Sequence, residues 1–174
     1  MIARASSFSP RQAAGLLLPF FTIIAAMLMM PLPMGLPLFG QSFMPNLPLL
    51  TIFLWTLYRP DLLPPFVVLA LGVLADLLMR GPLGVSCLVF LAGYGITISQ
   101  RVYWAGLKGL GLINGFLFVA FTAELLSWGA NSFAHGHLLS PLPAIVEGAA
   151  SIVFLPLARA VFGPFERLAG PGGV

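Results

Sequence analysis

Long uncharged apolar segments follow one another along this chain, separated by short segments that hold Gly, Pro and most of the charged residues. A helix needs roughly 20 apolar residues to cross about 30 Å of hydrocarbon, so the pattern allows about six crossings. The shortest segment, Leu47–Tyr58, could just span the bilayer, or it could be tilted or re-entrant. The predicted spans are Ala13–Met30, Leu47–Tyr58, Leu62–Met79, Leu83–Gln100, Gly109–Ala130 and Pro141–Phe162. The sequence therefore predicts an all-α fold, a polytopic membrane protein built as a compact bundle of about six transmembrane helices.

Turn-forming residues divide these spans. Met34–Asn46 is uncharged and rich in Gly and Pro, which predicts a loop. Arg80-Gly81-Pro82 predicts a tight turn, and Asn131–Ser140 predicts a longer loop. We expect a single transmembrane domain over residues 1–174, with a short cytoplasmic N-terminus over 1–12 and a short or disordered tail from about 167 to 174.

Composition agrees with this pattern. Hydrophobic residues make up 59% of the chain, charged residues 7%, and the mean hydropathy is +1.02. A soluble domain of this size needs far more surface charge, so the bilayer is the solvent that suits the chain. The net charge of +3 could suggest nucleic acid, but the basic residues are scattered singly at span ends. We therefore expect no nucleic-acid partner.

The basic residues also predict the orientation. With the N-terminus inside, the outer segments hold Arg80 alone, a strong positive-inside bias that favours an even number of spans. The inner segments then hold Arg4, Arg11, Arg59, Arg101, Lys108, Arg159 and Arg167. Five aromatic residues lie near predicted span ends, as interfacial anchors do, namely Trp55, Tyr58, Tyr103, Trp104 and Trp128. We therefore expect both termini in the cytoplasm.

Three acids lie inside predicted spans: Asp76, Glu124 and Glu147. In this orientation each lies in the outer part of its helix. A carboxyl in the membrane is costly unless it faces the bundle interior or water, so such residues are candidates for function. Arg80 follows Asp76 by four positions, and the two side chains can meet on one helix face. Either the acids share an outward-facing polar pocket with Arg80 at its rim, or each lies separately near the interface.

Other motifs point away from catalysis. The chain has no Ser/His/Asp order, phosphate-binding loop, HExxH motif or paired Cys set, so we expect neither an enzyme nor a cofactor. His135 and His137 lack a third ligand nearby in sequence, so we expect no metal site. Gly111 and Gly115 form a GxxxG pattern, which allows close helix packing within the chain or against a partner.

Two segments resemble the MreD family, the small membrane subunit of the bacterial rod-shape system. The first is PNLPLLTIFLW, in which Asn46 follows a Pro at the start of the second span. The second runs from Gly72 through Asp76-Leu77-Leu78 to Gly81-Pro82-Leu83-Gly84. The sequence departs from the family at Met79-Arg80, where the family usually has a small residue.

The physical chemistry of the second segment can be interpreted without the family. Gly81 and Gly84 permit a tight reversal between antiparallel helices. Pro82 can occupy the first turn of the next helix, because its missing N–H costs little there. Asp76 would then point into the bundle beneath the turn.

The resemblance implies a non-enzymatic, multi-pass subunit of the bacterial inner membrane. Its expected partners are MreC, the actin-like filament protein, a SEDS-type glycan polymerase, a class B penicillin-binding protein and membrane lipid. The family is also similar in build to the substrate-binding subunit of energy-coupling-factor vitamin transporters. The alternative is therefore a small-molecule binder, which should have a deep cavity and aromatic stacking residues.

The orientation gives a first prediction. Both termini should lie in the cytoplasm and the Asn131–Ser140 loop outside, because the basic residues concentrate on the other side. Reporter fusions, or labelling of a Cys introduced at position 137, measure this. Labelling from the cytoplasmic face alone would contradict the six-span arrangement.

Overall fold

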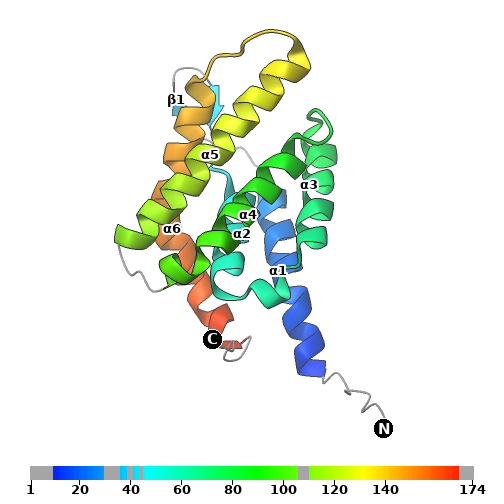
Figure 1. Ribbon diagram of the computed structural model, residues 1–174, viewed down its shortest axis with the longest axis vertical. Coiled ribbons are helices and arrows are strands. Elements are labelled where there is room, and N and C mark those ends of the chain that lie inside the picture. The colour runs from blue at the N-terminus through cyan, green and yellow to red at the C-terminus, as the bar shows by residue number, and fades with distance from the viewer. Residues whose placement is uncertain (1–9, 30–35, 39–40, 44, 106–109, 169–174) are drawn as a thin grey trace.

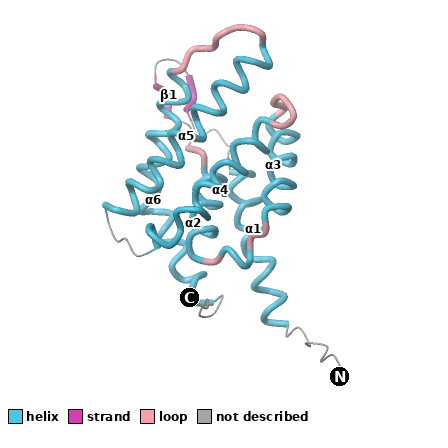
Figure 2. Tube along the Cα trace, viewed as in Figure 1, coloured by secondary structure: helices cyan, strands magenta, loops and turns pink. Residues whose placement is uncertain are grey.

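The computed structural model describes residues 10–29, 36–38, 41–43, 45–105 and 110–168. Within them lie six α-helices, one short 3-10 helix (Pro60–Leu62) and a two-stranded hairpin (Figure 2). The α-helices are α1 (Pro10–Met29), α2 (Leu47–Tyr58), α3 (Pro65–Met79), α4 (Val85–Ala105), α5 (Leu110–His135) and α6 (Leu142–Leu168). The predicted bundle of about six helices is confirmed. Of the predicted N-terminal segment 1–12 and tail 167–174, residues 1–9 and 169–174 lie outside the described residues, as does Lys108. Residues 10–12 belong to α1, and residues 167–168 belong to α6.

A small hairpin stands where the sequence predicted a loop. Strand β1 (Leu36–Leu38) pairs antiparallel with β2 (Gln41–Phe43), and β2 contacts α6. Strands of three residues are too short to show the alternation by which a strand is recognised in a sequence. The two strands add a small cap to the bundle without changing its helical class.

Successive helices run in opposite directions (Figure 1). The α3–α4 turn and the α5–α6 loop lie at one end of the molecule, and the start of α1 and the end of α6 lie at the other. At that second end, the Nε atom of Arg101 donates a hydrogen bond to the Leu57 carbonyl, 3.2 Å away, at the end of α2. Arg80, in the α3–α4 turn, lies at the opposite end from Arg101. The helices thus alternate in direction, and an even number of them leaves the start of α1 and the end of α6 at the same end of the bundle.

Helix α2 occupies the centre of the bundle. It contacts α1, α4, α5 and α6, and its residues from Pro48 to Leu57 are buried. Its 12 residues rise about 18 Å, less than the hydrocarbon thickness. Non-helical backbone at membrane depth is tolerated where protein buries it, so a short helix suits this central position.

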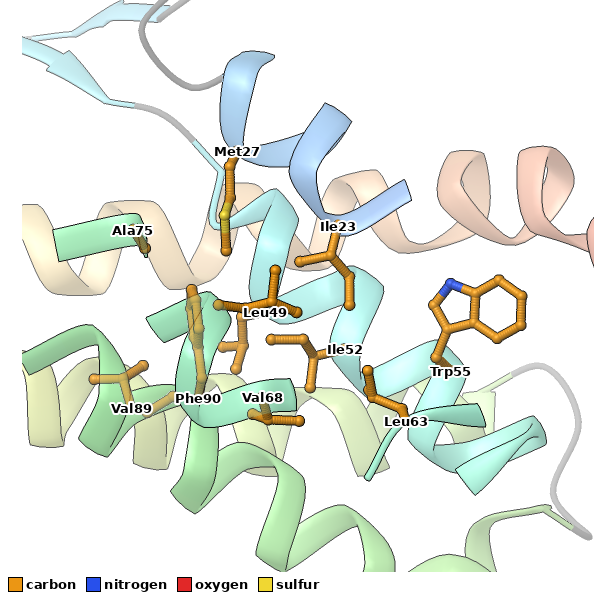
Figure 3. Close-up of a cluster of buried hydrophobic side chains, with 12 residues drawn as sticks. Ile23, Met27, Leu49, Ile52, Trp55, Leu63, Val68, Ala75, Val89 and Phe90 are labelled. Atoms are coloured by element: carbon orange, nitrogen blue, oxygen red, sulfur yellow. The ribbon is translucent and has the colours of Figure 1, made fainter. Parts of the chain in front are cut away.

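The first half of the core surrounds α2 (Figure 3). Ile23 and Met27 of α1 pack with Leu49 and Ile52 of α2, and side chains of α3 and α4 close the cluster. Trp55 belongs to this cluster, and its indole N–H donates to the hydroxyl of Thr22 at 2.9 Å. The prediction that Trp55 is an interfacial anchor is therefore wrong, because its indole group finds a partner inside the bundle.

The second half of the core joins α2, α4 and α5. The rings of Phe53 and Phe116 pack at an angle of 57°, with 5.1 Å between their centroids, and the buried Trp104 lies beside Phe53. Trp104 is thus a core residue and not the interfacial anchor that was predicted. A Cβ atom at Gly115 would stand 3.0 Å from the Trp104 ring, so this glycine of the GxxxG pattern serves packing within the chain.

Helices α3 and α4 approach each other closely. A Cβ atom at Gly72 would stand 2.6 Å from the Cα atom of Cys87, so any other residue would force the two helices apart. The close contact brings the end of α3 beside the start of α4, where the turn between them is built.

Asp76 holds that turn. Its two carboxylate oxygens accept hydrogen bonds from the backbone N–H groups of Gly84, at 2.6 Å, and Ser86, at 2.9 Å. These N–H groups lie at the start of α4 and have no partner within the helix, so the carboxylate caps it and is favoured by the helix dipole. Asp76 and Arg80 form no ion pair, and the predicted contact between them is wrong.

The backbone of the turn also differs from the prediction. Gly84 has a φ of +100°, as the predicted reversal requires, whereas Gly81 has no positive φ. Arg80 instead takes the left-handed conformation, with a φ of 52°, at the end of α3. Pro82 precedes the first residue of α4 by three positions and is not in its first turn.

Three helices extend past their predicted ends. α4 continues to Ala105 instead of Gln100, α5 to His135 instead of Ala130, and α6 to Leu168 instead of Phe162. Polar side chains support the extra turns of α5, since Asn131 donates to the Ser127 carbonyl at 2.8 Å. Among the described helices, α4 and α5 are each long and apolar enough to cross a membrane.

The turn generates a prediction about stability. Asp76→Asn should lower the free energy of unfolding by about 1–3 kcal/mol, because one acceptor oxygen becomes an NH₂ group that faces a backbone N–H. Arg80→Gly should be neutral or stabilising by about 1 kcal/mol, because glycine adopts the left-handed conformation without strain. Thermal unfolding in detergent, followed by tryptophan fluorescence, measures both. Equal damage from the two changes would mean that an Asp76–Arg80 pair holds the turn.

Candidate functional site

A polar cavity of about 280 Å³ lies between the α3–α4 turn and the α5–α6 pair. Asp76 of α3, Glu124 of α5 and Glu147 of α6 all line it. Asn46, Ser127 and Asn131 add polar groups to the wall. The structure thus brings together the three acids that the sequence places in the outer parts of separate spans.

Arg80 is not among the described residues that line this cavity. Its neighbours Met79 and Gly81 line it, while the Arg80 side chain is exposed. The reason is the left-handed conformation of Arg80, which ends α3 and breaks the i to i+4 geometry that the prediction assumed. The predicted basic group at the rim is therefore displaced from the acids.

Glu124 of α5 is buried inside the bundle. Its side chain is 6% exposed, and its Oε1 atom accepts a hydrogen bond from the Asn46 amide at 3.2 Å. Gly148 of α6 lies against the Glu124 side chain, and a Cβ atom there would stand 3.4 Å from it. Asn46 was missed because it lies 78 positions away in the sequence.

Asn46 connects three helices. Its Oδ1 atom accepts from the Leu49 backbone N–H at 3.2 Å and so caps α2. Its own backbone N–H donates to the Ser151 hydroxyl of α6 at 2.7 Å, and its Nδ2 donates to Glu124. The signal in the sequence was an Asn directly before an apolar span, which indicates a helix cap but not these two long-range bonds.

Glu147 is half-buried, and its carboxylate has no hydrogen bond or ion pair with any described residue. A second cavity, of about 360 Å³, lies against it. The two cavities share four lining residues, namely Glu124, Ser127, Asn131 and Glu147. Glu147 therefore stands between two adjoining polar spaces.

The cavities hold three carboxyl groups without a basic residue beside them. Among their described lining residues there is no Lys, Arg or His. His135 and His137 lie at exposed positions at the end of α5 and in the loop after it, and each contacts a backbone carbonyl. No three potential metal ligands stand together in the part of the chain that the structure describes. The arrangement suits a ligand that brings positive charge or hydrogen-bond donors.

Comparison with known proteins gives one match. Residues 9–162 match the family described as rod shape-determining protein MreD. No curated protein matches the chain. No solved structure matches it.

The family match covers well over half of the chain and confirms the resemblance found in its two segments. It also confirms the predictions of a polytopic membrane protein and of a non-enzymatic one. The chain belongs to the MreD family of rod shape-determining membrane proteins.

Proposed function

We propose that this chain is a non-enzymatic subunit of the bacterial cell-elongation complex in the inner (cytoplasmic) membrane. It supports MreC and the peptidoglycan synthesis machinery, and in this way maintains cell shape. The family match, which implies a role in rod-shape determination, supports this proposal. The further partners are the actin-like filament protein, a SEDS-type glycan polymerase, a class B penicillin-binding protein and membrane lipid.

The observation that carries the proposal is the set of carboxyl groups in the polar cavity, which lack a basic partner. Asp76 is satisfied by backbone N–H groups, and Glu124 by one amide, but Glu147 has no partner among the described residues. A carboxyl at membrane depth costs several kcal/mol unless a counter-charge or a donor accompanies it. A subunit that meets a partner here gains binding energy from groups that the partner supplies.

The division of labour among the acids follows from their bonds. Asp76 has a structural role, since both of its oxygens hold the α3–α4 turn. Glu124 is positioned by Asn46 and keeps its second oxygen for a partner. Glu147 keeps both oxygens. We therefore assign partner binding to Glu124 and Glu147 and a supporting role to Asp76.

The transporter alternative receives less support. A vitamin site needs aromatic side chains for stacking inside a deep cavity. Phe90 is the one aromatic residue among the described lining of the 280 Å³ cavity, and its ring already packs in the core. Trp128 lines the adjoining cavity, where its indole N–H donates to the Leu139 carbonyl at 2.8 Å.

The proposed function predicts a phenotype. Depletion of the protein in a rod-shaped host should give rounded or swollen cells, because wall synthesis would lose its elongation pattern. Re-expression should restore rods, as measured by microscopy and by labelling of newly made wall. Normal shape and wall synthesis after clean deletion, together with loss of vitamin uptake, would establish the alternative.

The charge of the cavity gives a second test. Glu124→Gln combined with Glu147→Gln should reduce retention of partner proteins about tenfold, since a hydrogen bond to a charged group contributes about 1.5–3 kcal/mol. The fold should persist, because the amide side chain introduced at position 124 keeps an oxygen that can accept from Asn46. Pull-down from gently solubilised membranes with mass spectrometry measures retention.

The matched control is Asp61→Asn. Asp61 is 61% exposed, belongs to the 3-10 helix between α2 and α3, and stands 3.7 Å from Arg59. Its neutralisation should leave both partner retention and cell shape unchanged. If the double glutamine variant behaves like this control, the cavity acids have no charge-dependent role.

A further inference from the structure

An apolar groove of about 350 Å³ lies between α5 and α6. Its walls are formed by Leu117, Phe121 and Leu125 of α5 and by Ile145, Ala149 and Ile152 of α6. Phe121 is 65% exposed and Ile145 is 61% exposed, so large apolar side chains stand on both edges. The groove is an open, apolar face of the bundle.

The floor of the groove admits a helix backbone. Ala120 of α5 and Ala144 and Gly148 of α6 line it, and small side chains allow membrane helices to approach closely. The lined part of α5 runs from Leu117 to Trp128, a rise of about 16 Å. This length equals about half of the hydrocarbon thickness.

Glu124 joins the groove to the polar cavities. It lines the groove and both cavities, and Trp128 and Ala144 are shared with the cavity beside Glu147. An apolar track therefore leads to two acids that lack a counter-charge among the described lining residues. The occupant that fits is apolar along most of its length and carries positive charge near Glu124.

Depth decides between a lipid and a protein helix. α5 has 26 residues and is about 39 Å long, so it extends about 4–5 Å past each side of a hydrocarbon layer centred on it. Glu124 is then about 12 Å below the outer hydrocarbon boundary. A lipid head group stays at the interface, whereas a helix can place a long Lys or Arg side chain at this depth.

A second copy of this chain does not meet the requirement. Among the described residues, the Lys or Arg at the outer end of the bundle is Arg80. It lies in the α3–α4 turn and not within a membrane span. The groove thus calls for a different protein.

We propose that the α5–α6 groove docks a single transmembrane helix of a partner protein, with a Lys or Arg in the outer half of that helix paired with Glu124 and Glu147. This inference rests on the proposed function, since it names the surface by which the subunit holds a partner. Small residues provide the close approach, and the buried ion pair fixes the depth of the partner helix.

Photo-crosslinking tests the groove directly in the full-length protein in its host membrane. A photoreactive phenylalanine analogue is placed at position 145, or at position 77 as the control. Ile145 and Leu77 are each 61% exposed, and Leu77 lies on α3 outside the groove. The expected result is an adduct at 145, at least about tenfold above that at 77, whose peptide is a transmembrane helix with Lys or Arg in its outer half. Adducts with lipid alone, or with a second copy of this chain, would overturn the proposal.

A larger side chain placed in the groove should block the partner helix, and this provides the second measurement. Ala149→Phe should reduce the adduct at position 145 about tenfold and round the cells, whereas Val153→Phe should do neither. Val153 is exposed on α6 outside the groove. If the unaltered chain does not restore rod shape to depleted cells, the proposed function fails. If it restores shape but gives no helix adduct at 145, the docking inference alone fails.

Discussion

The N-terminus of α2 imposes the constraint on which the rest of the structure depends. Its first backbone N–H groups have no partner within the helix, and the residue before them, Asn46, lines the polar cavity. Asn46 caps the helix through Leu49, donates its backbone N–H to Ser151 and donates its amide to Glu124. One residue thus satisfies a helix end and ties α2 to both α5 and α6. The position of the outer halves of α5 and α6 follows from these bonds.

The α3–α4 pair is fixed by a similar constraint. Asp76 provides the acceptors for the start of α4, and the contact of Gly72 with Cys87 holds the two helices together below the turn. The polar cavity is the space between this pair and the α5–α6 pair. Two separately secured helix pairs therefore form the walls of the site, which allows the acids to be held in place without a base beside them.

This arrangement suits a protein that acts by holding others. The acids are positioned by backbone N–H groups and by an amide, which leaves oxygens of Glu124 and Glu147 for groups from outside the chain. An apolar groove reaches the same acids from the side of the bundle. A partner helix could satisfy both surfaces together, and the energy of the pairing would be available only to a helix that carries its charge at the right depth.

The sequence by itself determined the number and order of the helices, because continuous apolar segments of membrane length have few other stable folds. It also identified Asp76, Glu124 and Glu147 and the two segments that place the chain in the MreD family. Local patterns failed where a contact crosses the bundle. Arg80 at i+4 from Asp76 suggested an ion pair, but the carboxylate oxygens instead accept hydrogen bonds from backbone N–H groups at the start of the next helix. The tertiary structure alone decided that Asn46 is the partner of Glu124 and that Trp55 and Trp104 lie in the core. These outcomes depend on which helix faces lie against each other, and that is set by the packing of all six helices together, not by the spacing of residues along any one of them.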